Sequence, residues 1–91
     1  MAIKISRLAE VDPRAEIADG VEIGPFCLVG PDVKVGAGTK LDSHVVLIGR
    51  TIIGERNRFL PNTVIGGDPQ DKSYKESDTQ VIIGDENTFR E

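Results

Sequence analysis

Aliphatic residues recur every six positions along most of the chain, and this period is the strongest pattern in the sequence. The periodic set is Val11, Ile17, Ile23, Val29, Val35, Leu41, Leu47, Ile53, Phe59 and Ile65. Ile5, Ile83 and Phe89 fall on the same phase, whereas Asp71 and Ser77 break it. An amphipathic α-helix would instead repeat its apolar residues every three or four positions. The pattern therefore indicates a repeat architecture built from short units.

Glycine and proline follow the same six-residue phase. Six of the ten glycines come directly after the aliphatic residue, and four of the five prolines come two places after it. The position four places after it is small or β-branched in most units: Ala15, Val21, Cys27, Val33, Thr39, Val45, Thr51 and Thr63. This residue and the next aliphatic are two apart, so both face the same side of a strand. Each unit is thus predicted to be a short strand followed by a turn at the glycine or proline.

Three such units would make a triangular coil, and about five coils fit in 91 residues. We predict an all-β fold in one domain, residues 1–91, in which stacked coils of a parallel β-helix bury an apolar prism. We call the position four places after the periodic aliphatic residue the small slot. Asn57 and Asn87 also occupy this slot, and we predict them at corners because asparagine tolerates left-handed φ. Residues 1–10 keep the phase less strictly, and Ile5 and Leu8 are predicted to cap the open end of the prism.

The segment from Asp68 to Gln80 is almost entirely polar. In strict register Asp71 and Ser77 would point into the apolar interior, and burying an unpaired carboxylate there is costly. We therefore predict an external loop at about 68–80. Loops on rigid scaffolds often carry function, but a solvated insertion without a role is an equal alternative.

The outward residues just before each inward aliphatic fall on three faces of the predicted prism. The first face carries Glu10, Leu28, Val46 and Val64, the second Glu16, Lys34, Ile52 and Gln70, and the third Glu22, Lys40 and Arg58. The corner residues that lead into the first face are Leu8, Phe26, His44 and Asn62. A contiguous apolar stripe on the first face predicts a subunit interface formed by Leu28, Val46, Val64, Phe26 and His44. The alternative is a row of ordinary exposed β-formers.

Charge and composition narrow the class of protein. The net charge is −4 with both signs interspersed, which disfavours nucleic acid as a partner. The sequence has no apolar run that could span a membrane and no signal peptide pattern, so no membrane insertion is expected. Cys27 is the single cysteine, which excludes a disulfide within the chain and favours a cytoplasmic location. Its inward slot favours a core role over a nucleophilic one, and no metal site or cofactor is predicted.

Two stretches resemble a known family. Residues 23–31 read IGPFCLVGP and are followed by Ser43-His44-Val45-Val46, and residues 65–71 read IGGDPQD with Tyr74 after them. They resemble the N-terminal part of the UDP-N-acetylglucosamine O-acyltransferases of lipid A biosynthesis, which are hexapeptide-repeat acyltransferases. The resemblance implies a left-handed winding, a homotrimer with active sites between subunits, and acyl carrier protein and UDP-N-acetylglucosamine as partners. It also implies transfer of a 3-hydroxyacyl chain to the sugar's 3-hydroxyl.

The resemblance assigns substrate binding to the polar loop. Gln70 and Asp71 match its binding residues, and Lys72 and Tyr74 belong to the same loop. Ser73 stands where a lysine commonly precedes the tyrosine, so a phosphate-contacting lysine does not carry over. The family's catalytic histidine lies in a later coil, so no catalytic residue is expected here, and we expect the chain to be the N-terminal part of a longer, active protein.

Other interpretations remain open. His44, the single histidine, is either a stand-in base or, on geometric grounds, a structural corner residue. The chain as a whole is either part of such an enzyme or a non-catalytic trimeric scaffold or binding module. A sugar nucleotidyltransferase tail is a third possibility, but it would require a glycine-rich nucleotide-binding domain upstream.

Overall fold

A computed structural model describes residues 3–66 and 80–90, and this part of the chain forms short strands without any helix. The strands are β1 (Lys4–Ile5), β2 (Glu10–Val11), β3 (Glu16–Ile17), β4 (Glu22–Ile23), β5 (Leu28–Val29), β6 (Val33–Val35), β7 (Lys40–Leu41), β8 (Val46–Leu47), β9 (Thr51–Ile53), β10 (Arg58–Phe59), β11 (Val64–Ile65), β12 (Val81–Ile83) and β13 (Thr88–Phe89).

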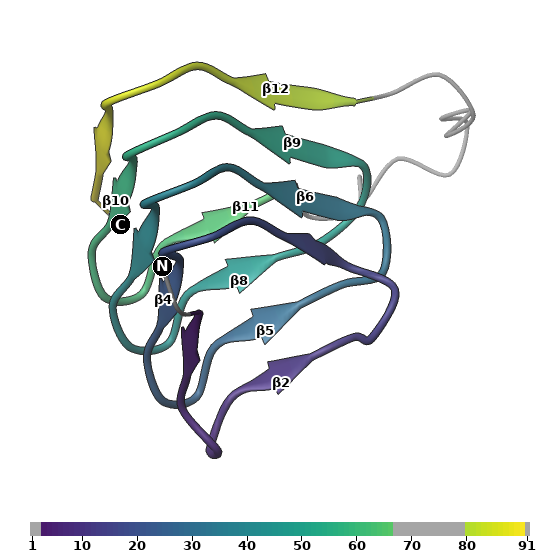
Figure 1. The fold of residues 1–91 in the computed structure, drawn as a ribbon, viewed down its shortest axis with the longest axis vertical. Coiled ribbons are helices and arrows are strands. Elements are labelled where there is room, and N and C mark those ends of the chain that lie inside the picture. The colour runs from purple at the N-terminus through teal and green to yellow at the C-terminus, as the bar shows by residue number, and fades with distance from the viewer. Residues whose placement is uncertain (1–2, 67–79, 91) are drawn as a thin grey trace.

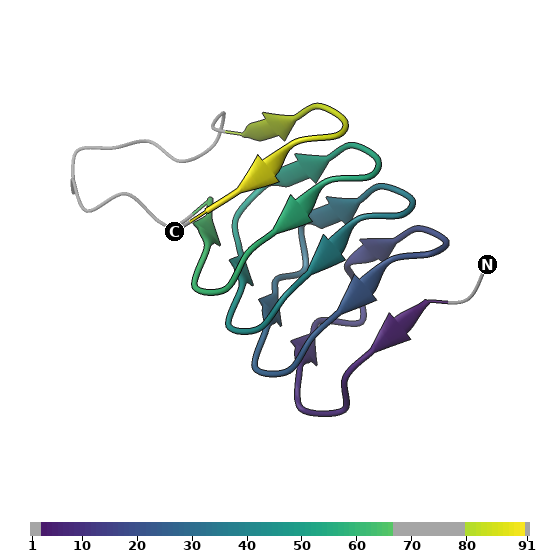
Figure 2. The ribbon, with the colours of Figure 1, turned by 90° about the vertical axis from the view of Figure 1, so that its left-hand side faces the viewer.

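The strands stack into three parallel sheets that form the sides of a prism (Figure 1). The sheet orders are β1-β4-β7-β10-β13, β11-β8-β5-β2 and β12-β9-β6-β3. Consecutive strands belong to different sheets, so the chain passes through all three sheets in rotation and then pairs with the coil below. Figure 2 shows the coils rising in sequence order from the N-terminal end to the C-terminal end. The described residues therefore form four coils and the first strand of a fifth, close to the expected count.

The register between coils follows the predicted period. Val29 pairs with Leu47, eighteen positions on, as in the other regular coils. Ile52 pairs with Ile82, thirty positions on, because the segment between β11 and β12 adds residues without adding a coil. The outward residue of β12 therefore lies on the second face, in the place where strict register would have put Gln70.

The core is the apolar prism that the repeat predicts. Its buried apolar residues are Val21, Ile23, Cys27, Val29, Val33, Val35, Leu41, Val45, Leu47, Ile53 and Phe59. The small slot is buried too where it holds Thr39, Thr51 and Thr63, and each of these hydroxyls donates to a backbone carbonyl. Toward the C-terminal end Phe59 stacks on Phe89 with ring centroids 4.8 Å apart.

Two corners of the prism contain columns of residues with left-handed backbone. Phe26, His44 and Asn62 form one column, with φ of 62°, 57° and 69°. The other column begins with two glycines and continues with Arg56 and Glu86, at 56° and 59°. The prediction that Asn57 and Asn87 take this conformation was wrong, since the residue before each of them does so. The side chain of Asn57 lies inside the prism and is 1% exposed.

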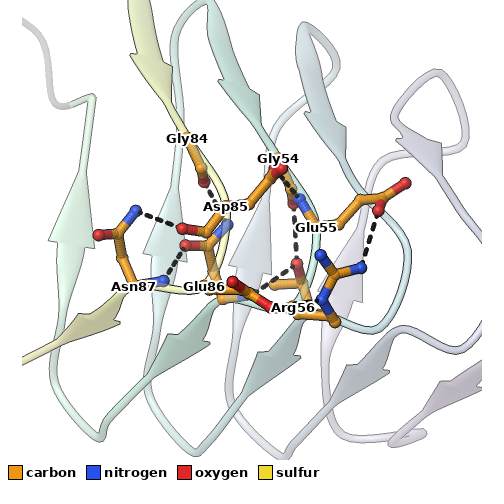
Figure 3. A network of polar contacts seen from close by, with 9 residues as sticks. Gly54, Glu55, Arg56, Gly84, Asp85, Glu86 and Asn87 are labelled. Carbon is orange, nitrogen blue, oxygen red and sulfur yellow. Dashed lines mark hydrogen bonds and ion pairs between the residues drawn. The ribbon is translucent and has the colours of Figure 1, made fainter.

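The asparagine side chain is buried because the coil above supplies its partners. Asn57 Nδ2 donates to the carbonyl of Gly84 at 2.7 Å, and Asn57 Oδ1 accepts from the backbone N–H of Asn87 at 2.8 Å. At the same corner Asp85 Oδ1 accepts from the N–H of Glu55 at 2.7 Å (Figure 3). These bonds join the third and fourth coils across the insertion and satisfy polar groups that burial would otherwise penalise.

The N-terminal segment is a regular coil. β1 pairs with β4, and Ile5 lies opposite Ile23 in the same register as the coils above. The prediction that Ile5 and Leu8 cap the prism was wrong, because Ile5 is part of a strand and Leu8 lies exposed at a corner. The repeat therefore already begins at Lys4.

Candidate functional surface

The outward residues of the sheet β11-β8-β5-β2 form a continuous apolar row. Leu28 pairs with Val46, and Val46 pairs with Val64, so the three side chains lie one above another. We call these three residues the apolar ladder. Glu10 lies below Leu28 at the lower end of the row. Leu28 is 41% and Val64 60% exposed, so the ladder presents substantial apolar area to its surroundings.

The corner beside the ladder extends the apolar surface. The rings of Phe26 and His44 stack with centroids 5.1 Å apart and an interplanar angle of 28°. Phe26 is 56% exposed, and its N–H donates to the carbonyl of Leu8 one coil below. The N–H of His44 donates in turn to the carbonyl of Pro25 at 3.1 Å. The structure thus brings together all five residues predicted for the interface, on one face and its adjoining corner.

The second face, on the sheet β12-β9-β6-β3, changes character along its length. Its lower part carries Glu16 and Lys34, whose charged groups are 3.9 Å apart. Its upper part carries Ile52 and Ile82, and Ile82 is 70% exposed. The sequence pattern missed this second apolar pair because it assigned a loop residue to the position that Ile82 occupies.

A hollow of about 400 Å³ lies where the second face meets the corner between the two apolar regions. It is lined by Arg14, Glu16, Pro31, Asp32, Val33, Lys34, Arg50, Ile52 and Gln80. Arg14 forms an ion pair with Asp12 at 3.1 Å, and this guanidinium lowers the pKa of the Asp12 carboxyl from its usual range. The hollow is bordered by Gln80, where the described chain resumes, and the carbonyl of Arg50 accepts from the N–H of Val81 there.

Cys27 is a core residue, as its slot predicted. Its Sγ donates to the carbonyl of Asp42 at 2.9 Å, and the residue is buried. Burial raises the pKa of the thiol, so little thiolate is present near neutral pH. Cys27 is therefore unsuited to act as a nucleophile. Within residues 3–66 and 80–90 there is also no group of side chains arranged to hold a metal ion.

The predicted substrate-binding residues Gln70, Asp71, Lys72 and Tyr74 lie outside the described residues, as does most of the predicted loop at 68–80. The structure describes the residues that flank that segment, at the end of β11 and at the start of β12. The described chain ends its first range at Gly66, just after β11, and resumes at Gln80 beside Arg50.

The fold and sequence match known proteins. The family model described as bacterial transferase hexapeptide (six repeats) matches residues 14–49. The chain is 46% identical over 89 residues to the acyl-[acyl-carrier-protein]--UDP-N-acetylglucosamine O-acyltransferase of Syntrophobacter fumaroxidans, covering 98% of this chain and 34% of that protein. Residues 14–49 of the chain thus carry the hexapeptide repeat of bacterial transferases. The hexapeptide-repeat chain is also 47% identical over 88 residues to the protein of the same name from Thermodesulfovibrio yellowstonii, covering 97% of this chain and 34% of that one.

A solved structure extends the match to three dimensions. The hexapeptide-repeat chain superposes on a crystal structure of UDP-N-acetylglucosamine acyltransferase with a TM-score of 0.91 and 44% identity, over 97% of this chain and 34% of that one. The fold is therefore the left-handed parallel β-helix of these enzymes, as the resemblance implied. The chain spans about a third of the length of the relatives that it matches. The described residues contain no helix long and apolar enough to cross a membrane.

Proposed function

We propose that this chain forms part of an acyl-[acyl-carrier-protein]--UDP-N-acetylglucosamine O-acyltransferase. That enzyme transfers a 3-hydroxyacyl chain from acyl carrier protein to the 3-hydroxyl of UDP-N-acetylglucosamine in the cytoplasm, as a step of lipid A biosynthesis. The observation that carries the proposal is the 46% identity to a relative of that name over 98% of this chain. A match over every described coil supports shared function more strongly than a generic repeat does, because the hexapeptide pattern alone occurs in many transferases.

The apolar ladder supports assembly of this chain with copies of itself. Three apolar residues in a row, with Phe26 and His44 beside them, form a contiguous apolar stripe, and such a stripe on a protein surface often marks an interface. One such row per subunit suits closed cyclic symmetry. We infer a homotrimer with this face at the interface, in which the clefts between subunits hold the substrates.

The polar loop supplies the sugar nucleotide contacts in this proposal. Gln70 and Asp71 bind UDP-N-acetylglucosamine, and Lys72 and Tyr74 contribute from the same loop. The described chain resumes beside the hollow that Arg14, Lys34 and Arg50 line. A polar loop anchored at a corner of a rigid prism is a favourable place for such contacts, because the scaffold fixes both of its ends.

The 91 residues by themselves contribute binding and assembly rather than a general base. A base that takes the proton of a sugar hydroxyl must be held in hydrogen-bonding reach of it, commonly by an orienting partner. The single histidine, His44, instead packs its ring against Phe26 on the apolar corner. We therefore predict no acyl transfer by this chain alone.

A chimera tests the proposal. The matching segment of the Syntrophobacter fumaroxidans relative is replaced by residues 1–91 of this chain, and acyl transfer from a 3-hydroxyacyl carrier protein to UDP-N-acetylglucosamine is measured. We expect activity close to that of the unmodified relative. Asp71→Ala in the chimera should lower kcat/KM by about 10- to 100-fold, as loss of a charged hydrogen bond would.

Asp68→Ala, at the edge of the same loop, is the matched control and should leave kcat/KM nearly unchanged. A folded, trimeric chimera without activity would contradict the proposal that this chain is part of the acyltransferase. It would favour the second candidate, a non-catalytic trimeric scaffold. The observation that favours a scaffold is the position of the single histidine on the apolar corner. Equal kcat/KM values for the Asp71→Ala chimera and the unsubstituted chimera would show that Asp71 does not contribute to substrate binding.

A further inference from the structure

His44 occupies a fixed place at the edge of the apolar ladder. Its left-handed backbone and the hydrogen bond from its N–H to Pro25 hold the residue at the corner between β7 and β8. Its ring stacks on Phe26, and Val46 of the ladder follows two residues later. Any copy of the chain that covers the ladder therefore also approaches or covers this imidazole.

Charged groups are absent from the parts of the corner that pack above and below His44. The corner below consists of Gly24, Pro25, Phe26 and Cys27, and the corner above of Leu60, Pro61, Asn62 and Thr63. Of these only Cys27 is titratable, and its thiol faces the core. On the histidine's own segment the nearest charged residue, Asp42, bonds to Arg58 of the third face at 3.4 Å.

Among residues 3–66 and 80–90, the other charged side chains of this face and of the His44 corner lie farther down. Glu10 lies two coils below His44, next to Leu28 in the outward row, and Arg7 stands beside Leu8 at the lowest corner. A proton taken up by His44 would thus add a positive charge to an apolar surface without a carboxylate on the adjoining corners to compensate it. Burying such a charge at an interface is costly, whereas burying the neutral ring is not.

We propose that His44 makes the self-association of this chain pH-dependent, with the neutral imidazole permitting assembly through the apolar ladder and the protonated imidazole opposing it. This inference rests on the proposed function, in that the ladder is taken to be the interface between copies. Each assembled trimer contains three copies of the residue. Acidification then protonates three histidines for each trimer that dissociates, so the assembly equilibrium depends steeply on pH.

The size of the response follows from linkage. Histidine is the side chain that in general changes charge between about pH 5 and about pH 8, so acidification across that range weakens assembly through each copy. Because a trimer contains three copies, the fold decrease in the trimerisation constant is the cube of the decrease that one copy causes. Stability of the assembly is lost as the pH falls, because the assembled state binds fewer protons than the separated chains.

Sedimentation equilibrium at about pH 7.5 and about pH 5.5, on the unsubstituted chain and on His44→Asn, tests the inference. Asparagine suits this corner, since Asn62 takes the same backbone conformation one coil above. We expect the unsubstituted chain to dissociate in acid and His44→Asn to stay assembled at both pH values. His44→Phe, which repeats the residue found at Phe26 one coil below, is a second non-titrating variant in case the asparagine weakens assembly at both.

The outcomes separate this inference from the proposed assembly. An unsubstituted chain that is trimeric at both pH values overturns the role of His44 and leaves the trimer standing. A chain that is monomeric at both pH values overturns the trimer and the pH dependence together. Dissociation in acid of both non-titrating variants would assign the effect to carboxylates and would equally overturn the role of His44.

Discussion

The side-chain oxygen of Asn57 accepts a hydrogen bond from the backbone N–H of Asn87, thirty positions later, at 2.8 Å. The same asparagine donates from Nδ2 to Gly84, so one buried side chain satisfies two backbone groups of the next coil. This contact spans the insertion between β11 and β12. It gives the fourth coil a polar anchor on the third at the point where the simple repeat is interrupted.

Loss of this anchor should destabilise the fold. Asn57→Ala leaves the Gly84 carbonyl and the Asn87 N–H without their partners in the prism. We expect a decrease of about 2–4 kcal/mol in the free energy of unfolding, measured by urea denaturation. Asn87→Ala is the control, because this residue is exposed and, among the described residues, its side chain makes one bond, to the carbonyl of Asp85 at 3.2 Å. An equal loss in both variants would refute the anchoring role.

Glycine is required at Gly36, where neighbouring coils approach each other closely. A Cβ on Gly36 would collide with the backbone carbonyl of Gly54 in the coil above, whereas a Cβ on Gly84 would meet no atom within 4 Å. Gly36→Ala should therefore destabilise the fold by about 1–3 kcal/mol through overpacking, and Gly84→Ala by less than about 0.5 kcal/mol. Thermal unfolding of the two variants under identical conditions measures the difference, and similar values would contradict this packing.

Cys27 should react with thiol reagents only when the fold opens. Burial both blocks access and raises the pKa of the thiol, so the labelling rate at about pH 8 should increase with urea in parallel with unfolding. Because the folded state holds the thiol proton more tightly, the stability that this group contributes is lost as the pH rises above about 8.5.

A matched control for this experiment places the thiol on the surface. In a chain carrying Cys27→Ala and Thr88→Cys, labelling should be fast without urea, since position 88 is exposed. Alanine suits the vacated slot because Ala15 already occupies the equivalent position in another unit. Fast labelling of native Cys27 at the rate of this control would show that the thiol is accessible.

Much of the fold follows from the sequence because each coil is built from the same short six-residue unit, and that unit is visible in the sequence. The inward pairs such as Val33 and Val35 fix which side of each strand is buried, and the structure has both of them in the core. The three outward faces follow from the same phase. The left-handed winding does not follow from it, since the hydrophobic pattern is the same for either hand. That feature came from the family resemblance.

Two local features escaped prediction for physical reasons. Asparagine favours left-handed corners in general, but Asn57 lies in a slot where the coil above offers a donor and an acceptor, and those bonds outweigh the backbone preference. Ile82 lies on the second face because the segment before β12 adds two six-residue units beyond the regular spacing between paired strands. The repeat pattern alone does not specify how many residues of an interruption lie outside the coils, so it could not assign Ile82 to a face.

The apolar ladder joins copies of this chain in the proposed assembly, and sedimentation equilibrium tests this most directly. At neutral pH the unsubstituted chain should have three times its mass of 9.9 kDa. Val46→Asp combined with Val64→Asp should give monomers, because like charges would be buried in the interface. Ile82→Asp, on the second face, should remain trimeric. A monomeric unsubstituted chain, or a doubly substituted chain that stays assembled while Ile82→Asp dissociates, would contradict assembly through the ladder.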